Sequence, residues 1–127
     1  MKTEMTKEHI LIVDNDLFFL QTVASYLNQN NYTVFAYTSP LVAIQKLKNL
    51  QPMTNSILIT DVQMDEMDGF ALTIQAKKII KKISVIMMTA SNSQFYKNKA
   101  IELGVVEYLE KPFPLANIKD ILEPLRV

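Results

Sequence analysis

Short apolar runs alternate with amphipathic segments along the chain. The clearest runs are rich in Ile, Val, Leu and Met, are bounded by polar residues, and cover residues 9–13, 56–60 and 83–88. Two weaker runs cover residues 32–37 and 105–109. Continuous apolar runs of this length are typical of strands that are buried on both faces, as in a parallel sheet. The pattern therefore predicts five strands.

The segments between these runs carry apolar residues at helical spacing, so one helix is expected after each strand. Ser39 followed by Pro40 is expected to open the second helix, and Asp68 can cap the third. Gly104 is expected to close the fourth helix and Pro114 to open the fifth. Strict alternation of strands and helices predicts right-handed crossovers and helices on both faces of one sheet. The fold class is therefore α/β, with a doubly wound, five-stranded parallel sheet.

Composition narrows the setting of this fold. The 127 residues include 49% hydrophobic residues, enough for one core, and we expect a single domain over 1–127 with residues 1–8 as a flexible N-terminal segment. The 13 basic and 13 acidic side chains balance, so no overall charge attracts the chain to nucleic acid or to a membrane. The lack of cysteine excludes disulfides and thiolate metal sites. With no signal peptide and no apolar run of about 18 residues, a cytoplasmic location is expected.

Polar side chains occupy the ends of the predicted strands, where doubly wound folds bind their ligands. Asp14 and Asn15 follow the first strand, Asp61 ends the third, Thr89 ends the fourth and Lys111 follows the fifth. Carboxylates that converge raise each other's pKa unless a cation lies between them. Magnesium favours oxygen ligands and is often held by only one or two carboxylates with a phosphate oxygen. Asp14, Asn15 and Asp61 suit such an ion.

The remaining strand ends suit phosphoryl chemistry. A hydroxyl at Thr89 and a fixed positive charge at Lys111 can neutralise the oxygens of a phosphoryl group during transfer. Asp61 stands alone at its strand end and is the better carboxylate nucleophile. These residues together predict an aspartyl-phosphate site.

The ordered set of motifs resembles the receiver domain of bacterial response regulators over essentially the whole chain. The matching segments are the acidic cluster at 10–16, the phosphoacceptor loop at 61–69, the strand with the switch hydroxyl at 86–90, and the aromatic and lysine segment at 104–113. Each segment by itself is a weak signal, but their order along one chain is highly specific. The resemblance implies the flavodoxin-like strand order 2-1-3-4-5.

The resemblance also implies roles for individual residues. Asp61 is the implied phosphoacceptor, Thr89 and Lys111 are the implied phosphate contacts, and Thr89 and Tyr108 form the implied switch. The implied Mg²⁺ ligands are Asp14, Asn15, Asp61 and the backbone carbonyl of Gln63. The side chains of Gln63 and Ser91 are implied to face the water that removes the phosphoryl group, and the Lys111–Pro112 bond is implied to be cis.

Partners follow from the same resemblance. The phosphoryl donor would be a phosphohistidine on a sensor histidine kinase or a histidine phosphotransfer protein. Output would go to a downstream protein target or to an effector domain outside these residues, with no direct contact to nucleic acid or membrane. Such a chain is a signalling domain that assists its own phosphorylation and dephosphorylation, and is not an enzyme in the usual sense.

Two departures from the family pattern keep other functions open. Asn15 stands where the family usually has an aspartate, and Asp65 stands where it usually has a proline. A receiver with impaired phosphorylation, acting only as a protein-binding module, is one alternative. A haloacid-dehalogenase-like phosphatase with Asp14 as its nucleophile is another, and a flavodoxin-like cofactor carrier a third. Carboxylates after the first strand would repel the phosphate of such a cofactor.

Structural roles also have to be weighed for several of these residues. Asp14, Asn15 and Asp16 are all good N-cap residues for the first helix. Tyr108 by itself fits an ordinary half-buried strand tyrosine. Phe95 and Tyr96 are adjacent in the fourth predicted helix, so they are not expected to face the core together. One of the two is expected to lie on the surface.

Overall fold

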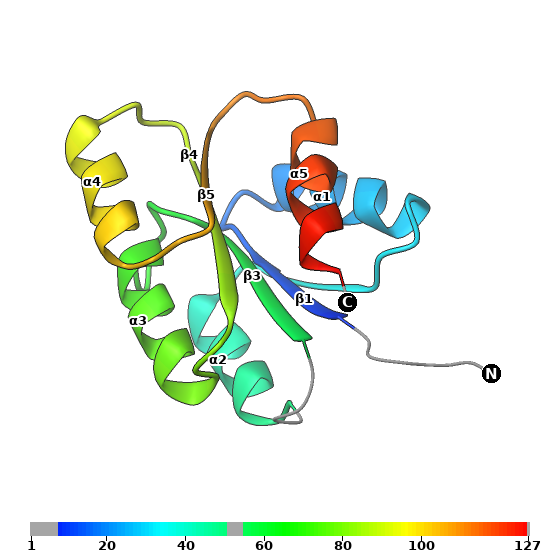
Figure 1. Cartoon of the computed structure of the whole chain (residues 1–127), viewed down its shortest axis with the longest axis horizontal. Coiled ribbons are helices and arrows are strands. Elements are labelled where there is room, and N and C mark those ends of the chain that lie inside the picture. Colours follow the sequence, from blue (N-terminus) through cyan, green and yellow to red (C-terminus); the bar gives the residue numbers. More distant parts are fainter. Residues whose placement is uncertain (1–7, 51–54, 127) are drawn as a thin grey trace.

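A five-stranded parallel sheet with helices on both faces forms the chain (Figure 1). The computed structural model describes residues 8–50 and 55–126. The strands are β1 (Glu8–Val13), β2 (Val34–Tyr37), β3 (Asn55–Asp61), β4 (Ser84–Thr89) and β5 (Glu107–Glu110). The helices are α1 (Leu17–Gln29), α2 (Pro40–Lys48), α3 (Gly69–Ile79), α4 (Gln94–Glu102) and α5 (Ala116–Leu122), with a 3₁₀ turn η1 (Glu123–Leu125) after α5.

The strand order is β2-β1-β3-β4-β5, which confirms the predicted doubly wound topology. In the register of the sheet Val13 pairs with Thr60, Asp61 with Met88, and Thr89 with Glu110. The carboxyl ends of β1, β3, β4 and β5 therefore lie at one edge. Strand order reverses between β1 and β3, which is where a ligand site is expected in such folds.

Two separate apolar layers explain why the strands are continuous apolar runs. Side chains on one face of the sheet, such as Leu11 and Met87, pack under α2, α3 and α4. Alternate side chains, such as Ile10 and Met88, pack under α1 and α5. Because successive side chains of a strand point to opposite faces, both sets must be apolar when both faces are covered.

The predicted helix caps are found in the structure. The Ser39 hydroxyl accepts a hydrogen bond from the Val42 amide at 3.3 Å, and Asp68 Oδ1 accepts one from the Ala71 amide at 2.8 Å. Gly104 follows α4 with a φ of 76°, in the left-handed region that glycine adopts without steric cost. These local signals determine where α2 and α3 begin and α4 ends.

Several predicted boundaries differ from the structure, by one residue at either end of β3 and β4 and by two at the start of β2, which begins at Val34. The fifth strand begins at Glu107 and not at residue 105, because the Val105 amide closes α4 by a bond to the Ala100 carbonyl at 3.2 Å. The fifth helix begins at Ala116, after a turn in which the Pro114 carbonyl accepts from the Asn117 amide at 2.9 Å. Residue 8 belongs to β1, and the rest of the segment expected to be flexible lies outside the described residues.

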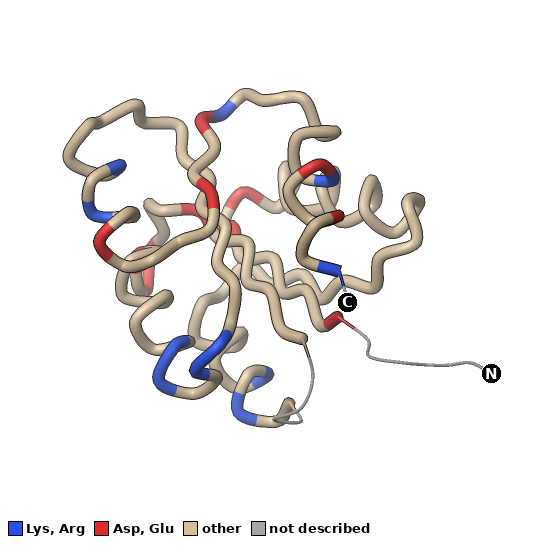
Figure 2. Tube along the Cα trace, in the orientation of Figure 1, with Lys and Arg blue, Asp and Glu red and all other residues tan. Residues whose placement is uncertain are grey.

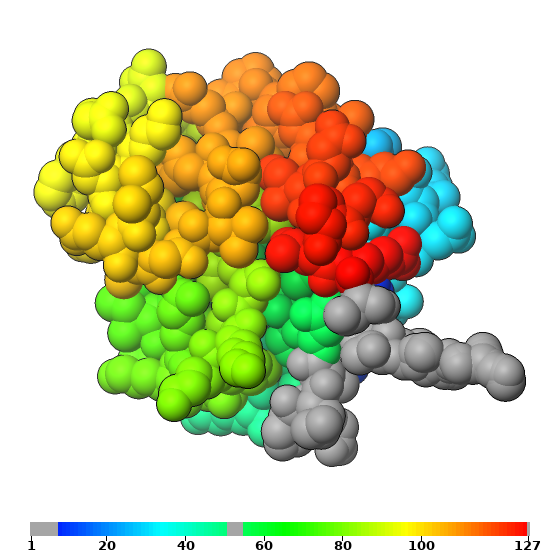
Figure 3. Space-filling view, viewed as in Figure 1, coloured from blue at the N-terminus to red at the C-terminus, as the bar shows by residue number. Residues whose placement is uncertain are grey.

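The surfaces of the last elements adjoin one another. Figure 3 shows α4, in yellow, directly beside the orange surface of β5 and the segment that follows it. No helix of the described chain is both long and apolar enough to cross a membrane.

Candidate functional site

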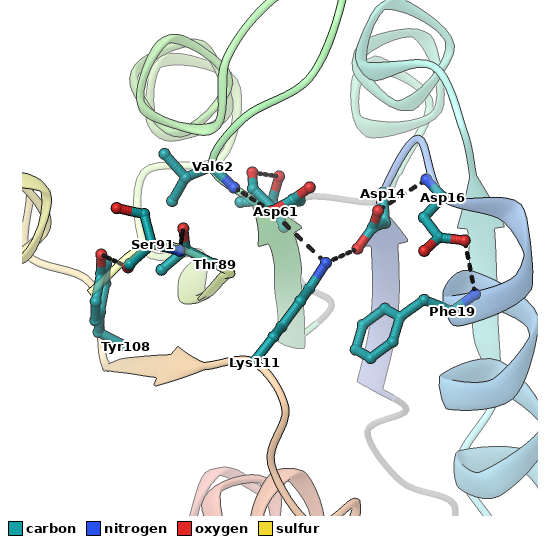
Figure 4. Close-up of polar contacts among 10 residues, drawn as sticks. Asp14, Asp16, Phe19, Asp61, Val62, Thr89, Ser91, Tyr108 and Lys111 are labelled. Carbon is teal, nitrogen blue, oxygen red and sulfur yellow. Dashed lines mark hydrogen bonds and ion pairs between the residues drawn. The ribbon is translucent and has the colours of Figure 1, made fainter. Parts of the chain in front are cut away.

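Asp14 follows β1 and is fully buried, and both of its carboxylate oxygens are engaged (Figure 4). Oδ1 accepts a hydrogen bond from the Asp16 amide at 2.9 Å, and Oδ2 lies 2.7 Å from Lys111 Nζ. A buried carboxylate needs such partners, because desolvation otherwise favours its neutral form. The end of β1 thus holds an anion that is fixed in place by a backbone amide and a lysine.

Asp61 is the last residue of β3 and is 8% exposed, which leaves its carboxyl group reachable from the edge of the sheet. Its Oδ1 accepts from the Val62 amide at 2.9 Å and lies 3.8 Å from Lys111 Nζ. Burial is the main cause that raises the pKa of Asp61, and the charge of Asp14 raises it further. Lys111 and the amides of Val62 and Gln63 oppose that shift.

Gly69 allows α3 to begin against the backbone at the end of β3. A Cβ atom at this position would collide with the Asp61 carbonyl oxygen. The Gly69 amide also donates to the Val62 carbonyl at 2.7 Å, which closes the loop between β3 and α3. The glycine is therefore required by close approach rather than by an unusual backbone angle.

Lys111 connects the two carboxylates. Its amide donates to the Thr89 carbonyl at 2.7 Å, so the backbone at the end of β5 is fixed to β4. Its ammonium group lies 4.3 Å from the centre of the Phe19 ring and between Asp14 and Asp61 (Figure 4). The following Lys111–Pro112 bond is cis, as the resemblance implies. One cation thus serves two carboxylates.

Thr89 and Tyr108 lie on the side of the site toward α4. The buried Thr89 hydroxyl accepts a hydrogen bond from the Ser91 amide at 3.1 Å. The half-buried Tyr108 hydroxyl lies 3.5 Å from the Ser91 carbonyl oxygen (Figure 4). Burial and then the charge of Glu110 raise the pKa of Tyr108. The structure therefore brings Thr89, Ser91 and Tyr108 together at the ends of β4 and β5.

Other predicted residues have different positions. Asn15 is exposed and lines a shallow groove with Ser39, Asp65 and Glu66. Asp16 is the N-cap of α1, since its Oδ1 accepts from the Phe19 amide at 3.2 Å. Of the three consecutive polar residues after β1, the structure uses only Asp16 as the N-cap.

Gln63 and Tyr96 form a contact that sequence reasoning did not find. Gln63 Nε2 donates a hydrogen bond to the Tyr96 hydroxyl at 3.1 Å, so the Gln63 side chain reaches α4. Phe19, which lies against Lys111, was also missed. Nothing in the local sequence marks either contact, because both depend on how the helices are placed over the sheet.

The donor set fits a hard divalent cation. Two carboxylates, Asp14 and Asp61, converge on a single lysine, and acidic segments gather at this edge of the sheet (Figure 2). No group of three or more His, Cys, Asp or Glu side chains that could hold a metal is found within residues 8–50 and 55–126. Two carboxylates nevertheless suffice for magnesium when water, carbonyl or phosphate oxygens complete its shell.

The chain matches the family model of the response regulator receiver domain over residues 10–123. This chain belongs to the response regulator receiver domain family. The receiver domain is a signalling module rather than an enzyme, and receivers of this family typically use Mg²⁺.

Curated relatives place the receiver in two-component signalling. It is 36% identical over 112 residues to the heme response regulator HssR of Staphylococcus epidermidis, covering 88% of this chain and 47% of that protein. It is 35% identical over 127 residues to Histidine kinase P4 of Formosa agariphila, covering 95% of this chain and 9% of that protein. The chain thus spans less than half the length of these relatives.

Solved structures agree with the fold. A CheY-like receiver domain protein from Methanospirillum hungatei is 25% identical, with a TM-score of 0.84 and coverage of 94% of each chain. A receiver domain protein from Clostridium thermocellum has a TM-score of 0.85 at 22% identity over 93% of each chain, a likeness of fold alone. Membership of the receiver family decides against the flavodoxin-like carrier and the phosphatase.

The position of Asp14 gives a physical reason against the phosphatase. Its side chain is fully buried, and its two oxygens are engaged by the Asp16 amide and the Lys111 ammonium. A nucleophile must be reachable by its substrate. Asp61, with some exposure at the edge of the sheet, is better placed for that role.

Proposed function

We propose that this receiver domain accepts a phosphoryl group on Asp61 from a phosphohistidine and thereby changes a surface that binds protein partners. The single observation that carries the proposal is the position of Lys111 Nζ, 2.7 Å from Asp14 and 3.8 Å from Asp61. A positive charge between two buried carboxylates, at strand ends that also carry the Thr89 hydroxyl, suits a group whose oxygens carry negative charge.

The transfer step balances with the residues at hand. A carboxylate oxygen of Asp61 attacks the phosphorus, the bond from phosphorus to the histidine nitrogen breaks, and the imidazole takes up a proton from solvent. Lys111 and the Thr89 hydroxyl contact the phosphoryl oxygens. The signal ends by hydrolysis: a water oxygen attacks phosphorus, the bond to Asp61 breaks, and inorganic phosphate leaves.

The proposed Mg²⁺ ligands are Asp14, Asn15, Asp61 and the backbone carbonyl of Gln63. When bound, Mg²⁺ offsets the charges of the carboxylates and of the phosphoryl oxygens, which otherwise repel one another. Asn15 supplies a neutral oxygen where the family usually has a carboxylate, so this receiver binds the ion less tightly than a receiver with an aspartate there. Two carboxylates share one lysine, and this excess of negative charge supports a metal ion at the site.

The proposed switch consists of Thr89 and Tyr108. A phosphoryl group on Asp61 draws the Thr89 hydroxyl toward it, and that movement changes the space beside the Tyr108 ring. The nearby Ser91 carbonyl, 3.5 Å from the Tyr108 hydroxyl, supports a linked movement of these groups. The altered surface includes α4 and β5, where a downstream protein or an effector domain is proposed to bind.

The donor is proposed to be a sensor histidine kinase or a histidine phosphotransfer protein. Both present a phosphohistidine on a protein surface, and Asp61 lies at an edge of the sheet that such a surface can approach.

The direct test is phosphorylation with a small donor. The protein is incubated with acetyl phosphate and Mg²⁺, and its intact mass is compared with that of Asp61→Asn. We expect one phosphoryl adduct on the wild type, none on the variant, and none in the presence of a chelator. A wild type that stays unmodified would instead favour a receiver that binds partners without phosphorylation, and an adduct that persists on the variant would favour a different acceptor.

A further inference from the structure

We propose that Tyr96 is a positioning residue for the Gln63 side chain, and that the hydrogen bond between them screens the open side of Asp61 from water and so lengthens the life of the phosphoryl group. The inference rests on the proposed function. It assigns to α4 a part in the chemistry of the site as well as in the contact with partners.

The bond begins next to the acceptor. Gln63 is two residues after Asp61, and the residue between them donates its amide to Asp61 Oδ1 at 2.9 Å. From there its side chain extends to α4, where Nε2 donates to the Tyr96 hydroxyl at 3.1 Å. The two residues are 33 positions apart in the chain. The Gln63 side chain therefore connects the loop that carries the acceptor to the first turn of α4.

Tyr96 is held firmly enough to act as an anchor. Its amide donates to the hydroxyl of Ser93, the N-cap of α4, at 3.3 Å. Its half-buried ring lies edge to face with Phe70 of α3, at a centroid distance of 5.6 Å. A tyrosine ring has only two side-chain torsions, so these contacts leave its hydroxyl little freedom. The neighbouring Phe95 is 68% exposed, and the expectation that only one of the pair faces the core is confirmed.

Gln63 itself is exposed and depends on this anchor. A glutamine side chain in water samples many rotamers, and ordering it costs free energy that only a specific partner offsets. With its amide bound to Tyr96, it extends from the loop after Asp61 to α4. A side chain fixed at the opening of a site limits the approach of water to the reacting atom. Loss of the bond frees the side chain and removes the screen.

The test compares the decay of the phosphoryl adduct in four proteins and a control. Wild type, Tyr96→Phe, Gln63→Ala and the double variant are loaded with acetyl phosphate and Mg²⁺, the donor is removed, and the adduct is followed by intact mass. Tyr96→Phe keeps the ring and its contact with Phe70 but lacks the hydroxyl. Tyr26→Phe is the matched control, since Tyr26 lies on α1 and its hydroxyl bonds to no other described residue.

We expect the adduct of Tyr96→Phe to decay about threefold faster than that of the wild type, the size set by one exposed, neutral hydrogen bond. Gln63→Ala should be at least as fast, and the double variant should match Gln63→Ala, because the hydroxyl acts only through the amide. Tyr26→Phe should match the wild type. An unchanged or slower decay in Tyr96→Phe, or effects that add in the double variant, would overturn the inference.

Failure of the proposed function gives a different result. If the wild type takes up no phosphoryl group, the bond is tested by amide hydrogen exchange over residues 62–68. Faster exchange in Tyr96→Phe than in both the wild type and Tyr26→Phe would show that the hydroxyl orders the acceptor loop. Equal exchange would show that it does not, and would overturn the positioning role.

Discussion

Two ionic clusters lie at opposite ends of β1. They contain similar groups but differ in what those groups do. The acceptor cluster follows the carboxyl ends of the strands and consists of Asp14, Asp61 and Lys111. The terminal clamp lies where β1 begins and the described chain ends, and consists of Glu8, Tyr32, Glu123 and Arg126. Each has two carboxylates and one basic side chain.

The terminal clamp satisfies each carboxylate with a partner of its own. Arg126 Nε lies 2.7 Å from Glu8 Oε2, and this bond is the main cause that raises the pKa of Arg126. The Tyr32 hydroxyl donates to Glu123 Oε2 at 2.6 Å, and the Arg126 guanidinium lies 4.2 Å from the centre of the Tyr32 ring. These contacts join β1, the segment before β2, and η1.

Burial and partner number separate the two clusters. In the acceptor cluster both carboxylates are buried and share one ammonium group, so charge remains unbalanced where water cannot screen it. In the terminal clamp Glu123 and Arg126 are exposed, and a neutral hydroxyl supplies the second donor. The excess negative charge of the acceptor cluster favours the binding of a cation. The terminal clamp has no such excess within its buried groups, and its contacts stabilise the fold. This difference is the reason why we propose a site at the first cluster and not at the second.

The largest expected effect is on the rate of phosphorylation when the basic side chain of the acceptor cluster is removed, and the same change in the terminal clamp is the control. Lys111→Met should lower the rate of adduct formation with acetyl phosphate by about 100-fold, because the phosphoryl oxygens lose a fixed positive charge. Arg126→Met should leave that rate unchanged. The rates are measured by intact mass at a fixed Mg²⁺ concentration, with circular dichroism to verify that both variants are folded. Equal rates for the two variants would contradict the distinction between a site and a clamp.

A smaller effect is expected from adding a carboxylate to the acceptor cluster. Asn15→Asp should tighten Mg²⁺ binding about tenfold, since it places a further negative charge beside Asp14 and Asp61. A Mg²⁺ titration followed by tyrosine fluorescence measures the affinity. Asn49→Asp, an exposed change at the end of α2, is the control and should leave the affinity as it is. Weaker or unchanged binding in Asn15→Asp would exclude residue 15 from the metal site.

The smallest effect concerns the hydroxyl of the terminal clamp. Burial, followed by the hydrogen bond to Glu123, raises the pKa of Tyr32 from 10.0 to about 12. The folded state therefore holds this proton more tightly than the unfolded state, so the stabilisation is fully present below pH 10 and is lost as pH rises toward about 12. Below pH 10, Tyr32→Phe should lower the free energy of unfolding by about 1 kcal/mol.

Urea unfolding at pH 8 and at pH 11.5 measures the difference between wild type and Tyr32→Phe. We expect the difference to shrink at the higher pH, while Tyr26→Phe shows no such change. A difference of equal size at both pH values would mean that the hydroxyl proton plays no part in the clamp.

Much of the fold could be predicted from the sequence, because strands, caps and turns depend on residues near one another in the chain. Continuous apolar runs predicted the buried strands, and Ser39, Asp68 and Gly104 marked helix ends through contacts with residues a few positions away. The weaker fifth strand was placed two residues too early because Val105 is apolar but serves to close α4. Local pattern alone does not distinguish these two uses of valine.

The closeness of the polar residues at the strand ends was predictable for a related reason. Parallel strands place their carboxyl ends at one edge, so topology by itself brings Asp14, Asp61, Thr89 and Lys111 together. The contacts of Gln63 with Tyr96 and of Glu8 with Arg126 join residues 33 and 118 positions apart. They depend on where α4 and the end of the chain pack against the sheet, and side chains at such surfaces meet only through the exact placement of whole elements. Tertiary packing therefore decided which neighbours surround the acceptor, whereas the sequence alone determined which residues stand at the strand ends.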